Sequence, residues 1–166
     1  QTCALPILLG LAVYESPMSW ESFWVIPGGV TAELATPKDP AVVAENFMKR
    51  MVGERRWNAL PERTRLQRLS EGPTLVGDIS DLIRGCPYDL TRITCPVVSG
   101  VGSCSQERFR RSARIVVDGC PDAKLVSVDG WNHNAHVGHP DDFDRLILQP
   151  LIRRVELGGW PESDSA

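Results

Sequence analysis

The chain has 166 residues, an apolar fraction of 42% and a net charge of −3, enough length for one domain that buries about two-thirds of its unfolded surface. The acidic balance argues against nucleic acid as the main partner, because phosphate binding needs a clustered surplus of Lys and Arg. The apolar stretch 4–14 is too short to span a bilayer, so we expect no membrane partner.

The first half of the chain predicts one strand followed by helices. A continuous apolar run over 8–14, bounded by prolines, is typical of a strand buried on both faces of a parallel sheet. Asp39-Pro40 supplies an N-cap followed by proline at the first helical position. Three helical stretches are predicted here, over 39–53, 61–69 and 75–83.

The second half alternates strands with helices. We predict a strand over 93–101, a helix over 106–117, a strand over 124–128 and a last helix from Pro140. Pro150 should kink that helix, because proline lacks the N–H that the helix interior needs.

This order of elements predicts an α/β fold with a parallel sheet and right-handed crossover helices. The helical stretch between the first two strands is far longer than one crossover requires, which indicates a cap or lid. We therefore expect four parts: a sheet strand in 1–17, a helical cap in 18–88, a C-terminal core in 89–157 and a polar tail in 158–166.

The chain begins at Gln1, almost inside the first predicted strand and without an initiating Met, so we expect a truncated protein. A truncated sheet leaves an exposed strand edge, which favours self-association or a homodimer through that edge. Five dispersed cysteines without CxxC spacing favour a reducing compartment, and hence a cytoplasmic location.

Ligands of open parallel sheets bind at the C-terminal ends of the strands. Three predicted strand ends carry polar side chains that together offer carboxylate, hydroxyl and imidazole groups: Glu15-Ser16, 102–105 and 129–139.

Four segments resemble α/β-hydrolases in the right order over most of 8–154. They are the strand before the cap (LAVYESP, 11–17), the penultimate strand (CPVVSGVG, 95–102), the entry to the last strand (PDAKLV, 121–126) and the histidine loop (GWNH, 130–133). The resemblance implies a partial α/β-hydrolase fold with a helical cap insertion.

The same resemblance makes His133 the general base, which takes a proton from the nucleophile and later delivers it to the leaving group. An imidazole titrates near neutral pH, which suits that work. The alternative interpretation is a loop histidine bonded to backbone.

The acid departs from the family's pattern. Its usual positions, two or three residues after the Gly that ends the penultimate strand, hold Cys104 and Ser105. Some relatives, among them haloalkane dehalogenases, carry the acid after the strand before the cap, where Glu15 stands. Glu15 is thus our candidate for orienting His133, the alternative being a structural Glu that bonds loop amides. Ser105 is either a substitute at the usual acid position or the N-cap of the next helix.

No Gly-x-Ser-x-Gly occurs in the 166 residues, and the family keeps its nucleophile upstream of the strand at which the chain begins. We therefore expect the chain alone to be inactive. The parent enzyme is expected to be an esterase-like hydrolase that cleaves a small apolar ester or related bond by a nucleophile–His–acid triad. The alternative is a catalytically inactive domain that binds a small molecule or a protein partner.

Tryptophans of the cap are candidates for lining an apolar substrate pocket, although they also suit an ordinary cap core: Trp20, Trp24 and Trp57.

Three weaker patterns compete with the triad. Cys104 follows a strand as the nucleophile of an elbow does, and 100–105 echoes a dinucleotide-binding turn without its third Gly. Histidines at 133, 136 and 139 have a spacing that suits metal ligands on a helix, but Gly138 and Pro140 disfavour a continuous helix there. We expect neither a cofactor nor a metal.

Overall fold

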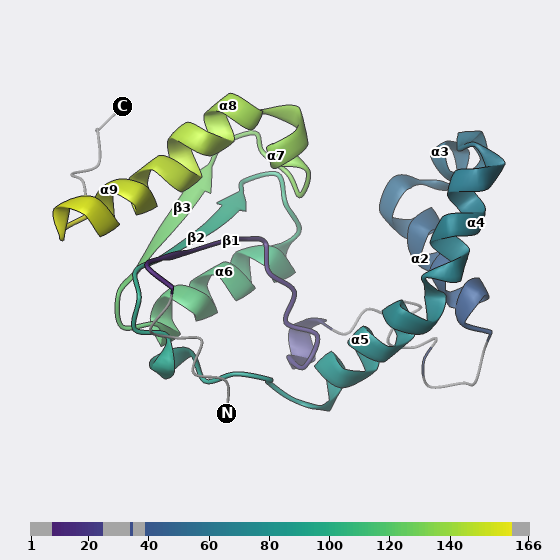
Figure 1. Cartoon of the computed structure of the whole chain (residues 1–166), viewed down its shortest axis with the longest axis horizontal. Coiled ribbons are helices and arrows are strands. Elements are labelled where there is room, and N and C mark those ends of the chain that lie inside the picture. The colour runs from purple at the N-terminus through teal and green to yellow at the C-terminus, as the bar shows by residue number, and fades with distance from the viewer. Residues whose placement is uncertain (1–7, 25–33, 35–38, 161–166) are drawn as a thin grey trace. The chain divides into compact units, whose positions relative to one another are not determined.

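The computed structural model describes residues 8–24, 34 and 39–160. Its centre is a parallel sheet of three strands: β1 (Leu11–Tyr14), β2 (Val97–Gly102) and β3 (Ala123–Val128). Strand β2 lies between the other two (Figure 1). The register pairs Tyr14 with Gly100 and Gly102 with Val128, so the three C-terminal ends lie at one edge of the sheet. The predicted α/β fold with a parallel sheet is confirmed.

The core forms on both faces of β2, all of whose residues are buried. Helix α6 (Glu107–Gly119) packs on β2 and β3, and the C-terminal helices cover the opposite face (Figure 1). On that second face Val98 is buried together with four residues of the histidine loop and the C-terminal helices: Trp131, Ala135, Ile147 and Leu151.

The C-terminal helical segment is divided into short helices. These are α7 (Ala135–Gly138), α8 (Pro140–Phe143), a π-helical segment (Asp144–Leu148) and α9 (Gln149–Leu157). The π-helical segment ends two residues before Pro150, which lacks an N–H and lies in the first turn of α9. After α9, the indole N–H of Trp160 donates to Asp122 Oδ1 at 2.7 Å, and residues 161–166 of the expected tail lie outside the described residues.

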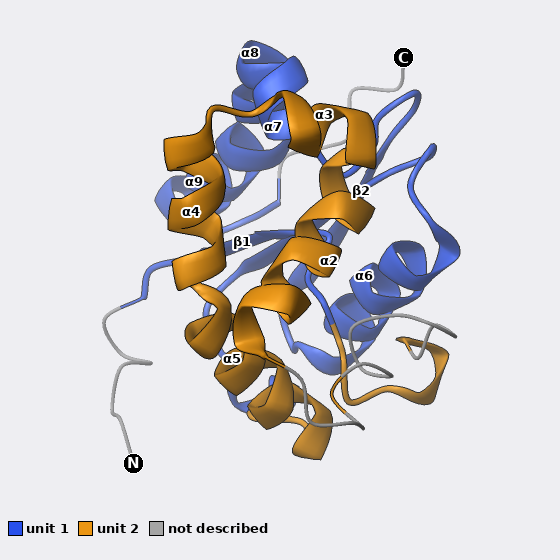
Figure 2. Cartoon of the chain, turned by 90° about the vertical axis from the view of Figure 1, so that its right-hand side faces the viewer, with its two compact units in different colours: residues 1–17, 88–166 blue, residues 18–87 orange. Residues whose placement is uncertain are grey.

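The contacts divide the chain into two compact units, Gln1–Pro17 with Tyr88–Ala166 (unit 1) and Met18–Pro87 (unit 2) (Figure 2). Unit 2 contains α2 (Pro40–Val52), α3 (Glu54–Ala59), α4 (Glu62–Ser70) and α5 (Gly72–Arg84), with a short 3-10 turn at Ser22–Trp24. Helix α2 packs against the other three helices. The three predicted helices are confirmed, and α2 begins as expected, with Asp39 Oδ1 accepting the Ala41 N–H at 2.9 Å.

Some boundaries differ from the expectations. Strand β1 is shorter than the apolar run 8–14, and β2 begins four residues later than predicted, after a 3-10 turn at Leu90–Arg92. Helix α3 was not predicted; Gly53, at a φ of 85°, ends α2 and is at the same time the N-cap of α3.

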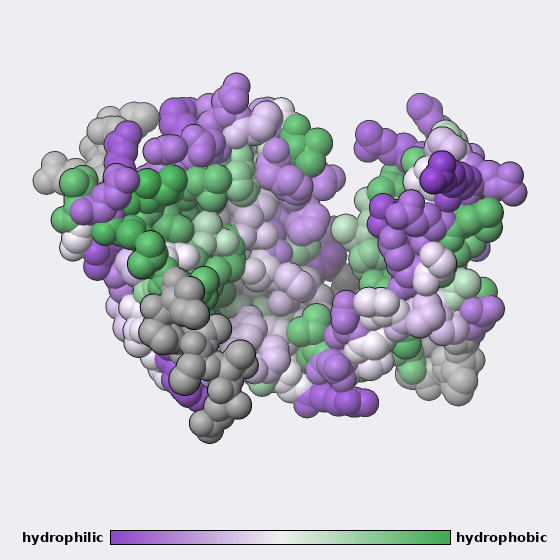
Figure 3. Space-filling model, in the orientation of Figure 1, coloured by the Kyte–Doolittle hydropathy of each residue, from purple (hydrophilic) through white to green (hydrophobic). Residues whose placement is uncertain are grey.

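Apolar side chains gather on the face of unit 1 that carries β1 and α9 (Figure 3). Large exposed apolar residues are Leu8 and Leu9, just before β1, and Ile152 and Leu157 of α9. Strand β1 is an edge of the sheet within the described residues. None of the described helices combines the length and the apolar character that crossing a membrane requires.

Candidate active site

Glu15 follows the last residue of β1 in an unusual backbone conformation. Its φ is 51°, and no other non-glycine residue in the described part of the chain has a positive φ. Such a conformation costs of the order of 1–3 kcal/mol and persists only where the surrounding structure imposes it. The Glu15 side chain is buried, with the whole residue only 1% exposed. A buried carboxylate in a strained turn is therefore the first sign of a functional site.

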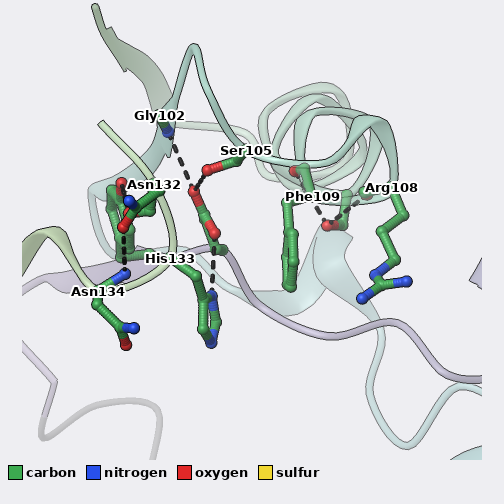
Figure 4. A network of polar contacts seen from close by, with 10 residues as sticks. Gly102, Ser105, Arg108, Phe109, Asn132, His133 and Asn134 are labelled. Carbon is green, nitrogen blue, oxygen red and sulfur yellow. Dashed lines mark hydrogen bonds and ion pairs between the residues drawn. The ribbon is translucent and has the colours of Figure 1, made fainter. Parts of the chain in front are cut away.

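Each oxygen of the Glu15 carboxylate has its own partners. Oε2 lies 2.9 Å from Nδ1 of His133. Oε1 accepts the backbone N–H of Gly102 at 3.1 Å and the hydroxyl of Ser105 (Figure 4). The ends of β1 and β2 thus meet the histidine loop at one carboxylate.

The histidine loop is fixed to both strand ends by its backbone. Gly102 packs so closely that a Cβ atom there would lie 2.1 Å from the carbonyl oxygen of Trp131. That same carbonyl accepts the N–H of Cys104 at 2.9 Å, and the Tyr14 hydroxyl donates to the carbonyl of Asn132 at 2.9 Å. With Trp131 buried in the core, these contacts hold the residue before His133 in place.

The imidazole of His133 is packed on one face. The ring of Phe109 stacks on it, with centroids 4.8 Å apart and planes 23° apart. The His133 side chain is 42% exposed. With Nδ1 occupied by Glu15, the remaining polar atom of the ring is Nε2. An ionised Glu15 accepts a hydrogen bond from Nδ1–H and so favours the tautomer in which Nε2 is a proton acceptor.

Tyr14 adds a neutral donor beside this pair. Burial of the phenol, followed by the nearby negative charge of Glu15, raises the pKa of Tyr14 well above its usual range. The phenol therefore remains protonated and keeps donating to the histidine loop.

The structure bears on three sequence hypotheses about the turn after β2. Ser105 is not the N-cap of α6, because Gln106 holds that position and the Ser105 hydroxyl donates to Glu15 instead. Cys104 is exposed and does not have the positive φ typical of a strained nucleophile elbow. The Gly102 N–H, which a dinucleotide-binding turn would direct at a phosphate, is occupied by Glu15.

The three histidines each lie against a different aromatic ring. His133 stacks on Phe109, His139 stacks on Trp131, and His136 meets the edge of Phe143. Within residues 8–24, 34 and 39–160, no three His, Cys, Asp or Glu side chains form a group that could hold a metal ion.

The three tryptophans expected in a cap lie in unit 2. Trp57 is 1% exposed, and its indole N–H donates to Glu45 Oε1 at 3.4 Å. It borders a small cavity of about 210 Å³ among the helices of this unit. Trp24 lies in the 3-10 turn, and Trp20 precedes it, both half-buried. A substrate pocket lined by these residues stays a prediction.

Sequence reasoning missed three contributors to this geometry. The Gly102 N–H, the stacking ring of Phe109 and the Tyr14 hydroxyl all act on Glu15, His133 or the histidine loop. Phe109 lies four residues after Ser105 on α6, a spacing that carries no signal of its own. Tyr14 directly precedes Glu15, so its proximity to the site was the one feature open to sequence reasoning.

Comparison with known proteins places the fold. No family model and no curated protein matches this chain. Among solved structures, MenH from S. aureus is similar with a TM-score of 0.56 and 19% identity, over 90% of this chain and 60% of that one. BpoC from Mycobacterium tuberculosis, described as a non-heme bromoperoxidase, is similar with a TM-score of 0.51 and 12% identity, over 92% of this chain and 60% of that one.

An α/β-hydrolase from Sphaerobacter thermophilus gives a TM-score of 0.45 at 18% identity, over 76% of this chain and 52% of that one. The chain thus spans 60% of the length of MenH and BpoC. Together with the three parallel strands and their flanking helices, the likeness to those two structures shows the fold. The chain has, in part, the α/β-hydrolase fold.

Proposed function

We propose that Glu15 and His133 are the acid and the base of a hydrolytic triad. The observation that carries the proposal is the 2.9 Å contact between Glu15 Oε2 and His133 Nδ1, made by a carboxylate whose other oxygen is already engaged. Such an arrangement holds the imidazole in one orientation with Nε2 free to accept a proton, which is the task of the base in a triad.

In the proposed reaction, His133 Nε2 accepts the proton of the nucleophile as that group attacks the carbonyl carbon of an ester. Glu15 stays ionised and stabilises the imidazolium that forms. The imidazolium then gives its proton to the departing alkoxide. In the second half, His133 accepts a proton from water, the resulting hydroxide attacks the acyl intermediate, and the nucleophile recovers its proton.

The nucleophile is the part of the proposal that these residues do not supply. The 166 residues contain no Gly-x-Ser-x-Gly, so we assign the nucleophile to sequence outside them. Its identity as Ser, Asp or Cys decides between esters or lactones and epoxides or carbon–halogen bonds. A small, apolar substrate is our first choice, since the helical unit contributes Trp20, Trp24 and Trp57.

The test uses the complete protein that the gene encodes, assayed on p-nitrophenyl butyrate and on a lactone, an epoxide and a haloalkane. We expect turnover of at least one, and His133→Ala should lower kcat/KM by roughly 10³-fold or more. His136→Ala is the matched control, because His136 is exposed and lies three residues further on, in α7, and it should leave the rate nearly unchanged.

Three results would count against parts of the proposal. If His133→Ala has the rate of the unaltered protein, His133 is not the base. Esterase activity of the 166-residue chain alone, abolished by the same substitution, would show that the nucleophile lies within these residues. Failure of all four substrates would favour an inactive domain that binds a ligand or a partner.

A further inference from the structure

The Glu15 carboxylate is buried, and its oxygens contact the Gly102 N–H, the Ser105 hydroxyl and the imidazole of His133. A buried carboxylate is stable only if its oxygens accept hydrogen bonds. Oε1 receives two donors, the Gly102 N–H and the Ser105 hydroxyl, while Oε2 faces His133 (Figure 4). The two oxygens are therefore in different environments.

This difference matters because the last side-chain torsion of a glutamate is soft. Rotation about the bond to the carboxylate meets only a broad, roughly two-fold preference, so packing and hydrogen bonds decide the plane of the group. Without a firm hold on Oε1, the plane of the carboxylate would turn, and Oε2 would no longer point at Nδ1. The donors to Oε1 thus set the direction of the contact with His133.

Ser105 is itself held firmly. The residue is 7% exposed, and its N–H donates to the Gly102 carbonyl at 3.2 Å. Its carbonyl accepts from Arg110 Nη1 at 2.7 Å, and the same nitrogen donates to the Ser103 carbonyl at 2.9 Å. A turn fixed at both its N–H and its carbonyl leaves the hydroxyl aimed at Glu15.

We propose that Ser105 is a positioning residue whose hydroxyl fixes the plane of the Glu15 carboxylate and so aligns the imidazole of His133. The proposal rests on the triad assignment of Glu15 and His133. It gives a role to a position that, in the resemblance described above, holds the acid itself. Ser105 acts through the acid and does not touch the reacting atoms.

The test measures the tautomer of His133 in the 166-residue chain by ¹⁵N NMR of the imidazole, together with the low-field signal of the Nδ1 proton. Ser105→Ala removes the donor, Ser105→Cys keeps the size with a weaker donor, and Ser105→Thr keeps a hydroxyl. Ser112→Ala is the matched control, because Ser112 is also buried, on α6, but its hydroxyl donates to helix carbonyls. Backbone amide spectra check that each variant is folded.

We expect a single Nδ1–H tautomer with a low-field proton signal in the unaltered chain, in Ser112→Ala and in Ser105→Thr. Ser105→Ala should give a mixture of tautomers and lose the low-field signal, with Ser105→Cys between the two. In the complete protein Ser105→Ala should lower kcat by about 10- to 100-fold at unchanged KM, the effect of one hydrogen bond to a charged group.

The outcomes separate this proposal from the one on which it rests. An unchanged tautomer in both Ser105→Ala and Ser105→Cys overturns the role of Ser105. If the tautomer of His133 then changes only in Glu15→Gln, the pairing of Glu15 with His133 still stands. If Glu15→Gln does not alter the tautomer either, the pairing of Glu15 with His133 fails, and the triad assignment fails with it. Should Ser105→Ala not fold, the comparison of Ser105→Cys with Ser105→Thr decides.

Discussion

The strand ends around Glu15 and the helices of unit 2 use polar side chains in different ways. Around Glu15 they are buried or partly buried and join residues far apart in the chain, with separations of 87, 90 and 118 residues. In the helices the ion pairs join residues three or four apart on partly or fully exposed surfaces: Lys49–Glu45, Arg68–Glu71 and Arg84–Asp81. Exposed pairs contribute about 0–1 kcal/mol each, whereas a broken buried network costs several times more.

The difference shows which residues of the two regions tolerate substitution. Unit 2 depends on its apolar core and on local helix signals, so most of its polar surface tolerates change. The strand ends depend on a few close contacts that only the folded chain brings together. Substitutions in the two regions should therefore differ in size for reasons that can be separated.

The largest effect on stability is expected from breaking the core of the helical unit. Trp57→Ala should lower the free energy of unfolding by about 3–5 kcal/mol, because it empties the space of a fully buried ring. Urea unfolding measures the loss, and hydrogen exchange should place the strongest loss of protection in α2 and α3. A loss below about 1 kcal/mol would contradict the assignment of Trp57 to the core.

A nearly equal loss of stability is expected when a single methyl group is added at the strand ends. Gly102→Ala places a Cβ atom 2.1 Å from the backbone oxygen of Trp131, and backbone cannot move aside as a flexible side chain would. We expect a loss of about 3 kcal/mol in urea unfolding and a displaced His133.

The matched substitution is Gly77→Ala, in the middle of α5 with nothing within 4 Å of the added atom. Because alanine favours helix, this variant should be more stable by roughly 0.5–1 kcal/mol. Equal effects of the two substitutions would refute the close approach of Gly102 to the histidine loop.

An intermediate, pH-dependent effect is expected at Tyr14. Its raised pKa means that the folded chain keeps the phenol proton where the unfolded chain loses it, so stability falls as pH rises past the ordinary tyrosine value of about 10. Tyr14→Phe should cost about 1 kcal/mol at neutral pH through the lost bond to Asn132, and should remove this alkaline loss. Urea unfolding at neutral pH and near pH 11 measures both effects.

Tyr88, the second tyrosine and 42% exposed, supplies the control. Tyr88→Phe should retain the alkaline loss of stability. If Tyr14→Phe retains the alkaline loss of stability as fully as Tyr88→Phe does, the Tyr14 hydroxyl is not buried beside Glu15.

The smallest effects are expected on the helical surface. Asp39→Ala removes the N-cap of α2 and should cost about 1 kcal/mol. Arg84→Ala breaks an ion pair whose two side chains are each 77% exposed, and should change stability by less than about 0.5 kcal/mol. Thermal unfolding ranks the two, and a larger loss for Arg84→Ala would reverse our view of which local contacts matter.

Local signals explain what could be predicted from the sequence. Asp39-Pro40 predicts the start of α2, and the apolar runs around 8–14 and 93–101 predict two strands. These predictions succeed because helix capping and strand burial depend on a few neighbouring residues. Helix α3 escaped prediction because its six residues are too short for a periodic pattern. Strand β2 was placed too early because the residues before Pro96 have the same apolar character as a strand.

The site divides in the same way. That polar residues end neighbouring strands is visible in the sequence, so Glu15 and His133 could be chosen as a pair, and the structure places them in contact. The direction of the Ser105 hydroxyl could not be predicted, because it depends on how the histidine loop packs against Gly102. The role of a backbone N–H such as that of Gly102 cannot be predicted from residue types, because nearly every residue has one.

The central claim, that the Glu15 carboxylate orients His133 for catalysis, is tested most directly by Glu15→Gln in the complete protein. The amide has the same shape, but its NH₂ group would face Nδ1 and favour the wrong tautomer of the imidazole. We expect kcat to fall by about 10⁴-fold, while Glu156→Gln, at an exposed position on α9, leaves it unchanged. A Glu15→Gln variant within about 10-fold of the unaltered protein would contradict the account.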